Sequence, residues 1–373
     1  MSLVSKVKGK LGFGCMRFPM KDGEVDTETL SAMIDEYFAA GFNYFDTAHG
    51  YLNGKSETAL CECLVKRYPR DSYILVNKLS APFFKSREDI RPFFESQLSL
   101  CGVDYFDVYL MHAQDALLYE RYKAHGAYEI ALELKAEGKI KHFGISFHDK
   151  AAVLDRILAE NPEIELVQIQ FNYADYENPS VESKKCYEVC RKYGKLVSVM
   201  EPVKGGALAN LPSDAQKIIA SLGGGSAASL AIRFAAGFDG VLTVLSGMGS
   251  LEMMRDNVSY MKSPRPLDER ENTAIGEVLA VLHSLDTIDC TACRYCTPVC
   301  PMKIPIPDLF ACMNGKKLFE GWNADYYYEI HTQSGGLASS CIYCSRCEKH
   351  CPQHLKIPEL LKKVADTFEK KEK

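Results

Sequence analysis

Eight of the fifteen cysteines stand in two runs of identical spacing. The runs read Cys290-x2-Cys293-x2-Cys296-x3-Cys300-Pro301 and Cys341-x2-Cys344-x2-Cys347-x3-Cys351-Pro352. Three thiolates two residues apart on a tight loop can reach three irons of one cube, and the proline then turns the chain away. This spacing binds cubane iron–sulfur clusters, and where two such clusters occur the fourth Cys of each run ligates the other cluster. The chain is therefore expected to hold two [4Fe–4S] clusters.

The expected ligand sets are crossed between the two runs. Structural zinc is the alternative, but zinc sites usually pair two short C-x2-C knuckles across a longer gap, which fits two four-Cys runs poorly. Disulfides fit less well still, because nothing near the N-terminus resembles a signal peptide. The other seven cysteines are scattered, and most are expected to be small buried hydrophobes. The first expected set is Cys290, Cys293, Cys296 and Cys351; the second is Cys341, Cys344, Cys347 and Cys300.

Length and composition bound the class of protein. With 373 residues, of which 47% are hydrophobic and 25% charged, the chain can form one large domain and a small one. A net charge of −5 indicates no nucleic-acid partner. No apolar stretch approaches the roughly 20 residues that span a bilayer, so no membrane partner is expected. We expect a cytoplasmic protein.

Short apolar runs alternate with amphipathic stretches from about Leu11 to Met261. Apolar strands that alternate with helices are typical of βαβ units and a parallel sheet. Eight strand–helix units in roughly 250 residues predict a (β/α)8 TIM barrel. A doubly wound open sheet is the alternative, but the expected Gly-rich fingerprint is incomplete at Gly12-Phe13-Gly14. The predicted strands are Leu11–Cys15, Asn43–Asp46, Tyr73–Lys78, Phe106–His112, His142–Ser146, Leu166–Phe171, Leu196–Met200 and Gly240–Ser246.

The amphipathic stretches between the predicted strands, and the sequence after them, predict the helices and the domain bounds. Residues 1–262 are expected to form the barrel. Residues 263–373 are expected to form a linker, a helix over Asp268–Leu285 and a small, mainly helical iron–sulfur domain. The predicted barrel helices are Thr27–Ala40, Ser56–Arg67, Arg87–Leu100, Tyr119–Glu137, Lys150–Ala159, Ser180–Tyr193 and Ser226–Ala236.

Ionisable residues stand at the carboxyl ends of three predicted strands, where barrel active sites are built. Asp46 ends the second strand, Lys78 the third and His112 the fourth, and Tyr51 follows Asp46 in a Gly-containing loop. Each alone is weak evidence, because a strand-end Lys can be solvated and a His can be a satisfied core residue. The alternative to a catalytic site is that Asp46 and Lys78 form only an internal ion pair that stabilises the barrel.

In combination and order, these residues lie in motifs that resemble the aldo-keto reductase family over nearly the whole predicted barrel. With the Cys runs, the chain is similar to a branch of that family that carries a C-terminal two-cluster ferredoxin-like domain. The motifs are Phe45-Asp46-Thr47-Ala48-x-x-Tyr51, Val76-Asn77-Lys78-Leu79, Asp107-Val108-Tyr109-Leu110-Met111-His112, Gly138-Lys139-Ile140-x-x-Phe143-Gly144-Ile145-Ser146, Val167-Gln168-Ile169-Gln170-Phe171-Asn172, Ser246-Gly247-Met248 and Asp256-Asn257.

The resemblance implies that Asp46, Tyr51, Lys78 and His112 form a catalytic tetrad. Reduction of a carbonyl needs a hydride on carbon and a proton on oxygen. A free Tyr, with a pKa near 10, is a reluctant acid or base. A neighbouring Lys⁺ favours the phenolate, and Asp46 can hold that Lys in place. His112 can hydrogen-bond and orient the carbonyl oxygen.

The resemblance also implies a pyridine nucleotide, with Ser146 and Gln168 at the carboxamide. Phe147 and Met200 depart from the common pattern, which has an Asn and an aromatic ring there. Gly247 and Met253 replace the basic residues that commonly grip a 2′-phosphate, although Arg255 is near, so the choice between NADH and NADPH stays open. The residues expected to contact the nucleotide are Met16, Arg17, Ser146, Gln168, Met200, Pro202, Gly205, Ser246, Gly247, Met248 and Asn257.

The expected function is therefore an NAD(P)H-dependent oxidoreductase that interconverts a carbonyl and an alcohol by hydride transfer in the barrel. The clusters would exchange electrons with a partner such as a ferredoxin or flavoprotein. Two alternatives remain: a redox-sensing nucleotide-binding protein, against which the intact tetrad argues, and a reductase whose clusters are only structural.

Overall fold

The structure is a computed structural model that describes residues 2–178, 181–284, 287–288, 290, 294–319, 323–333, 335–351 and 353–369. The chain divides into two compact units. One comprises Met1–Lys204 with Ala228–Leu267, and the other comprises Gly205–Ala227 with Asp268–Lys373. The predicted division after residue 262 lies near the third and last crossing between the units, after Leu267, while residues 205–227 join the C-terminal unit.

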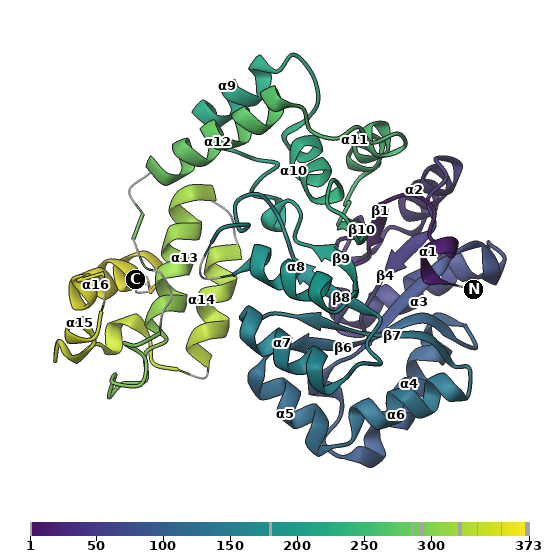
Figure 1. The fold of residues 1–373 in the computed structure, drawn as a ribbon, viewed down its shortest axis with the longest axis horizontal. Coiled ribbons are helices and arrows are strands. Elements are labelled where there is room, and N and C mark those ends of the chain that lie inside the picture. Colours follow the sequence, from purple (N-terminus) through teal and green to yellow (C-terminus); the bar gives the residue numbers. More distant parts are fainter. Residues whose placement is uncertain are drawn as a thin grey trace. The chain divides into compact units, whose positions relative to one another are not determined.

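Eight parallel strands close into a barrel in the first unit (Figure 1). The first strand pairs with both the second and the last strand of the barrel, which completes the ring. The predicted (β/α)8 barrel is confirmed. Its strands are β1 (Leu11–Gly14), β4 (Tyr44–Asp46), β5 (Ile74–Leu79), β6 (Phe106–Gln114), β7 (Ile140–Phe147), β8 (Leu166–Gln170), β9 (Leu196–Met200) and β10 (Val241–Ser246).

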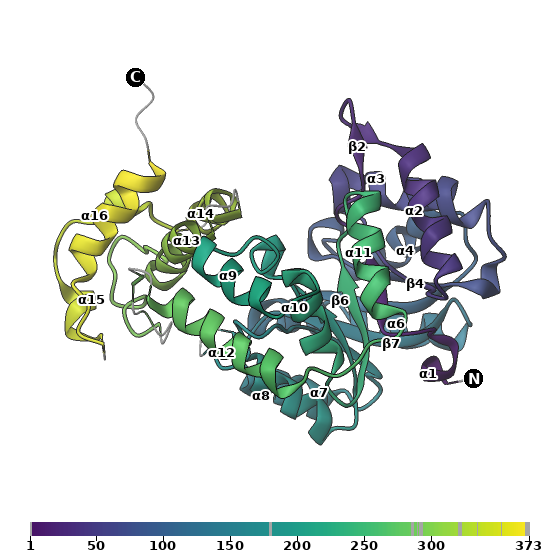
Figure 2. The ribbon, with the colours of Figure 1, turned by 90° about the horizontal axis from the view of Figure 1, so that it is seen from above.

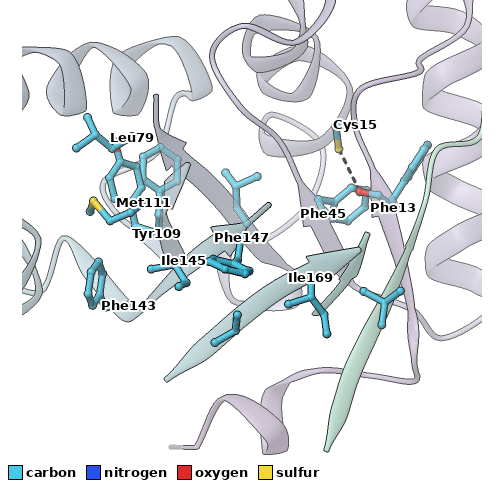
Figure 3. Packing of buried hydrophobic residues seen from close by; sticks show 14 of the residues in the cluster. Phe13, Cys15, Phe45, Leu79, Tyr109, Met111, Phe143, Ile145, Phe147 and Ile169 are labelled. Carbon is cyan, nitrogen blue, oxygen red and sulfur yellow. Dashed lines mark hydrogen bonds between the residues drawn. The ribbon is translucent and has the colours of Figure 1, made fainter. Parts of the chain in front are cut away.

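Alternate residues of the strands belong to two separate hydrophobic clusters, as the two-residue period of a strand requires. One cluster contains Phe45, Leu79 and Tyr109 and packs the strands against the helices (Figure 3). The other contains Ile74, Val76, Val108, Leu110 and Leu166, together with Leu3 of α1 (Leu3–Lys6). We assign this second cluster to the barrel interior, and it defines the series of inward-facing positions.

Helices cover the barrel between successive strands, and two of them differ from the prediction. The single helix predicted over Tyr119–Glu137 is two helices, because Gly126 adopts a left-handed conformation (φ +63°) that ends the first. The helix predicted over Ser56–Arg67 changes after Leu60 into a π-helical turn, η2 (Cys61–Val65). The helices are α2 (Thr27–Ala39), α3 (Lys55–Leu60), α4 (Arg87–Cys101), α5 (Ala116–Ala124), α6 (Ala127–Ala136), α7 (Ala151–Glu160), α8 (Ser183–Lys192), α10 (Ala227–Ala236) and α11 (Leu251–Met261).

The loop that follows β1 carries a small hairpin formed by β2 (Met20–Lys21) and β3 (Glu24–Val25). The region that follows β9 was not predicted as helical and contributes α9 to the second unit. Among the described residues, no helix is long and apolar enough to cross a membrane.

The second unit is mainly helical, as predicted (Figure 2). Its α9 (Ser213–Ser221) packs against α12 (Glu269–Ser284), and α13 (Ile306–Phe319) packs against α14 (Asn323–Gln333) and α16 (Ile357–Phe368). The core of this unit combines aliphatic side chains such as Leu309, Leu361 and Val364 with Cys296 and Cys347. Short elements complete the unit: η6 (Ala338–Ser340) and α15 (Arg346–Lys349).

Candidate functional site

The inward-facing series of the strands ends in ionisable residues at one edge of the barrel. Tyr44 is followed two residues on by Asp46, Val76 by Lys78, and Leu110 by His112. The same alternation that fills the barrel with apolar side chains therefore directs these three groups inward. Active sites of such barrels lie at this carboxyl edge of the strands.

Lys78 is the hub of the group. Its Nζ donates to Asp46 Oδ1 at 2.6 Å, to the carbonyl oxygen of Thr47 at 2.7 Å and to the Tyr51 hydroxyl at 3.3 Å. The ammonium also lies 4.8 Å from the centre of the Tyr51 ring. Lys78 and Asp46 are both buried, so the ion pair is shielded from solvent and its hydrogen bonds fix the position of the ammonium beside Tyr51.

The electrostatics keep Tyr51 protonated at neutral pH. Burial raises the pKa of Tyr51 above its ordinary value; Lys78 lowers it, as predicted, but does not outweigh burial. Burial would lower the pKa of Lys78, but Asp46 and Tyr51 together raise it, so the amine is an ammonium. The structure thus presents a phenol proton beside a fixed cation.

His112 closes the group on the side of Tyr51. The two rings meet edge to face with their centres 6.2 Å apart. Burial, followed by the charge of Lys78, holds the pKa of His112 well below its usual range, so the imidazole is neutral at pH 7. Nδ1 of His112 lies 2.6 Å from Oγ of Ser80. When Ser80 donates to Nδ1, the ring carries its proton on Nε2, where it can be donated to a substrate oxygen.

A buried carboxylate braces the strand that carries Lys78. Glu57 accepts from Asn77 at 2.7 Å and from Gln97 at 3.2 Å, and lies 2.6 Å from Nδ1 of His49. Gln97 also donates to the carbonyl oxygen of Lys78 at 3.1 Å. Sequence reasoning missed this network and Ser80. Only the position of Asn77 next to Lys78 hinted at it, because the partners lie on α3 and α4, far along the chain.

The two residues expected at a nicotinamide carboxamide lie on neighbouring strands, and their register pairs them directly. Ser146 is buried and accepts the backbone N–H of Ala113 at 2.7 Å, and its hydroxyl proton is used by no hydrogen bond within the described residues. Gln168 donates from Nε2 to Asp46 Oδ2 at 2.9 Å, a contact not predicted, which leaves Oε1 as an acceptor. The pair offers one donor and one acceptor, which is the set that a carboxamide requires.

Most of the residues expected near the rest of the nucleotide follow β1, β9 and β10 or lie on α11. Asn257 on α11 donates to Ser246 at 2.9 Å and accepts from Tyr260, and the side chain of Arg17 lies against Gly247. The other expected contact residues are placed as follows: Met16 is exposed, Met248 is buried, Met200 ends β9, Pro202 follows it, and Gly205 lies in the second unit.

Arg255, the cation considered for a 2′-phosphate, is held by an acid. Its Nη2 and Nε donate to both carboxylate oxygens of Glu36 at 2.5–3.1 Å. This exposed pair joins α11 to α2 within the barrel unit. The pairing with Glu36 therefore lowers the positive charge that Arg255 could offer to a 2′-phosphate.

In the second unit, the cysteines line two separate cavities. One cavity is lined by Cys300 together with Cys341, Cys344 and Cys347. The other is lined by Cys290 and Cys296 together with Cys351. In each, a cysteine of one run joins those of the other, as the crossed ligand sets require; Cys293 lies outside the described residues. Among the described residues, no group of three or more His, Cys, Asp or Glu side chains lies close enough together to hold a single metal ion.

The two cavities are built by a repeat of 51 residues, the separation of Cys290 from Cys341. Arg294 and Ser345 are 51 residues apart and therefore equivalent in the repeat, and both have a left-handed backbone (φ +61° and +51°). So do Lys303 and His354, both at +52°. The repeat then starts a helix at the same point in each half: α13 at Ile306 and α16 at Ile357, each followed by proline. These residues extend the symmetry beyond the cysteines that revealed it in the sequence.

Comparison with known proteins decides the family. A model of the Aldo/keto reductase family matches residues 10–280, well over half of the chain. The chain belongs to this family. A model of the 4Fe-4S dicluster domain matches residues 289–356, which contain both Cys runs. The predicted combination of a reductase barrel with a C-terminal dicluster domain is confirmed, and the protein is an aldo-keto reductase-type oxidoreductase.

Several relatives have named activities. NADH-specific methylglyoxal reductase of Escherichia coli (strain K12) is 26% identical over 207 residues, which cover 51% of this chain and 61% of that protein. L-galactose dehydrogenase of Arabidopsis thaliana is 25% identical over 299 residues, which cover 74% of this chain and 92% of that one. The structure of aldo-keto reductase AKR11C1 from Bacillus halodurans (holo form) aligns with a TM-score of 0.59 and 25% identity over 72% of this chain and 91% of its own.

Proposed function

We propose that this aldo-keto reductase uses NAD(P)H to interconvert a small carbonyl compound and an alcohol at the barrel edge. The observation that carries the proposal is the buried Lys78, whose Nζ contacts both Asp46 and the Tyr51 hydroxyl. Reduced nicotinamide, when bound, supplies the hydride that is added to the carbonyl carbon.

The residues of the chain supply the proton and the orientation. Tyr51 donates its phenol proton to the carbonyl oxygen, and Lys78 stabilises the phenolate left behind. Asp46 keeps Lys78 charged and in place, since burial alone would lower its pKa. The neutral His112 donates a hydrogen bond to the same oxygen and thereby orients the carbonyl.

The nucleotide is proposed to bind through residues at the carboxyl ends of the strands. Ser146 donates to the carboxamide oxygen and Gln168 accepts from the carboxamide nitrogen. NADH is favoured over NADPH, because Glu36 already holds Arg255 and Gly247 and Met253 carry no charge. The NADH-specific activity named for the E. coli relative is in line with this preference.

The second unit is proposed to hold two [4Fe–4S] clusters with crossed ligands. Cys300, Cys341, Cys344 and Cys347 would hold one and Cys290, Cys293, Cys296 and Cys351 the other, because each cavity is lined by cysteines from both runs. The clusters, when bound, supply one-electron transfer to or from a partner protein.

The barrel chemistry is tested by Tyr51→Phe, which removes the phenol proton and leaves the ring. We expect the kcat of carbonyl reduction to fall by about 10²–10⁴-fold, while the Kd of NADH changes less than about twofold. The control adds Phe83→Tyr to the Tyr51→Phe variant, which supplies a phenol at a different, exposed ring and should not restore activity. Full activity in Tyr51→Phe would show that another group donates the proton.

A further inference from the structure

The cavity lined by Cys300, Cys341, Cys344 and Cys347 has large apolar side chains at its surface. Met302 and Ile342 line the cavity and are 38% and 60% exposed, and the adjacent Tyr343 is 55% exposed. Exposed apolar side chains gathered in this way mark sites of interaction. Cys344 itself is exposed, so the thiol set reaches the surface here.

The segments that form this cavity are basic. Lys303, Arg346 and Lys349 are exposed, and none of them forms an ion pair with a residue that the structure describes. Glu348 is the single acid in residues 341–356 and residues 294–305 contain none, while α16, which lines the cavity through Pro358 and Leu361, carries the exposed Glu359. The whole chain carries a net charge of −5, so this positive patch opposes the overall charge.

The other cavity differs although the 51-residue repeat relates the two. There, Arg294 is neutralised by Asp308, with two N–O distances of 2.7 and 2.9 Å. Of the cysteines described at that cavity, Cys296 is buried and Cys290 and Cys351 are half-buried. The described cysteines at repeat-related positions are equally covered, so the two cavities differ in charge: Arg294 is paired with Asp308, whereas Lys303, Arg346 and Lys349 form no ion pair with a described residue.

We propose that the surface formed by Met302, Ile342, Tyr343, Lys303, Arg346 and Lys349 docks an acidic one-electron carrier protein. This proposal rests on the proposed function, because the cluster held by Cys300, Cys341, Cys344 and Cys347 is the one that exchanges the electron. One electron passes from the cluster to the oxidised carrier, or from the reduced carrier to the cluster. The cluster is oxidised or reduced by one electron accordingly, and no bond or proton changes.

The physical basis is that of other transient interfaces. Complementary charge steers the carrier to the face and raises the association rate at low ionic strength. The apolar side chains supply the water-excluding centre of a small interface, of the size that short-lived redox encounters use. An acidic carrier is favoured over a basic one because the three exposed cations Lys303, Arg346 and Lys349 outnumber the two acids, Glu348 and Glu359, in the segments that form the cavity.

The test uses the cluster-loaded full chain and an acidic plant-type [2Fe–2S] ferredoxin as probe. Lys303→Glu, Arg346→Glu and Lys349→Glu are combined in one variant. The matched control combines Lys8→Glu, Lys141→Glu and Lys262→Glu, which change the same charge at exposed sites of the barrel unit. Calorimetry measures the Kd at low and high salt, and iron content and cluster potentials are recorded for every protein.

We expect the Kd of the probe to rise at least tenfold in the triple variant at low salt and to stay within about twofold in the control. The difference should shrink at high salt. A basic cytochrome c should bind the triple variant more tightly than the parent. Lys349→Gln alone, on the short α15, should weaken binding of the probe severalfold. This single variant tests the proposal even if the triple variant fails to fold.

Equal binding by parent and variants, or no binding of the probe by the loaded parent, would overturn the docking proposal. The proposal would also be overturned if Lys349→Gln shifted the cluster potentials or lowered the iron content while the Kd of the probe stayed unchanged. The cations would then act on the cluster and not on the carrier. Absence of iron from the anaerobically purified parent is a different result, since it overturns the proposed clusters themselves.

Discussion

The barrel and the second unit gather their functional side chains in opposite ways. In the barrel, Asp46, Lys78 and His112 come from three strands spread over 67 positions of the chain, and each is the last inward-facing residue of its strand. In the second unit, each cavity draws on cysteines that lie within seven positions of one run and on one cysteine of the other run. The first arrangement is set by the closed sheet and the second by local backbone turns.

The difference has a consequence for how each site fails. A group in the barrel is held by partners on other elements, as Lys78 is by Asp46 and Gln97, so a substitution changes pKa values and orientation around it. A cysteine of the second unit is one wall of a cavity, so its loss removes a whole ligand.

The largest effect is expected from single cysteine replacements. Cys300→Ser should lose the same cluster as Cys344→Ser, although the two lie in different runs, because both line one cavity. Cys351→Ser should lose the same cluster as Cys296→Ser. Iron should fall from about eight to about four atoms per chain, and the spectra of dithionite-reduced protein should match within each pair. A match of Cys300→Ser to Cys296→Ser instead would show that the runs ligate separately.

Lys78→Met tests the coupled barrel site. It leaves Asp46 buried without its partner, which costs about 3–5 kcal/mol of folding free energy when one partner of such a pair is removed. Since the charge of Lys78 lowers the pKa of Tyr51, its removal should raise that pKa further. The alkaline limb of carbonyl reduction, which needs the phenol, should move to higher pH, and alcohol oxidation at pH 9, which needs the phenolate, should fall. Lys78→Arg keeps the charge and should show a smaller shift of the pH profile.

Ser80→Ala tests the orientation of His112. Loss of the hydrogen bond to Nδ1 frees the ring to adopt the other tautomer, so we expect kcat to fall about tenfold or less with little change in nucleotide affinity. Ser80→Thr retains the hydroxyl and should recover most of the activity. An unchanged kcat in Ser80→Ala would remove Ser80 from the catalytic arrangement, whatever the role of His112.

The smallest effect is expected at the exposed pair of Glu36 and Arg255. Glu36→Gln releases Arg255 and should tighten NADPH binding a few-fold while leaving NADH within about twofold, because an exposed ion pair is worth about 1 kcal/mol or less. Fluorescence titration of both reduced nucleotides measures this. Tighter binding of NADH rather than NADPH would place Arg255 away from a 2′-phosphate.

The sequence predicted most of what is periodic or local. The eight strands were found within about two residues of their ends, because runs such as Ile74–Leu79 are buried along their whole length and read as continuous apolar segments. The cysteine spacing predicted which residues share a cavity. The tetrad was predicted from motifs, and the structure brings its four members together.

What the sequence did not predict depends on long-range packing. Glu57 reads as a helix-surface acid, and its complete burial follows only from Asn77 and Gln97 meeting it from other elements. The break at Gly126 was hidden by helical periodicity on both sides of it. The net rise in the pKa of Tyr51 was also missed, because the sequence names the neighbouring charge but not the depth of burial.

The repeat in the second unit has a consequence for the order of assembly. With crossed ligands, the cavity that begins with Cys290 is completed only by Cys351, whereas the cavity that begins with Cys341 has its full set once Cys347 is made. Under the proposed ligation, the run that is synthesised first would be the last to obtain its complete ligand set. Neither half of the repeat would then supply four ligands on its own, since each would provide one ligand to the other.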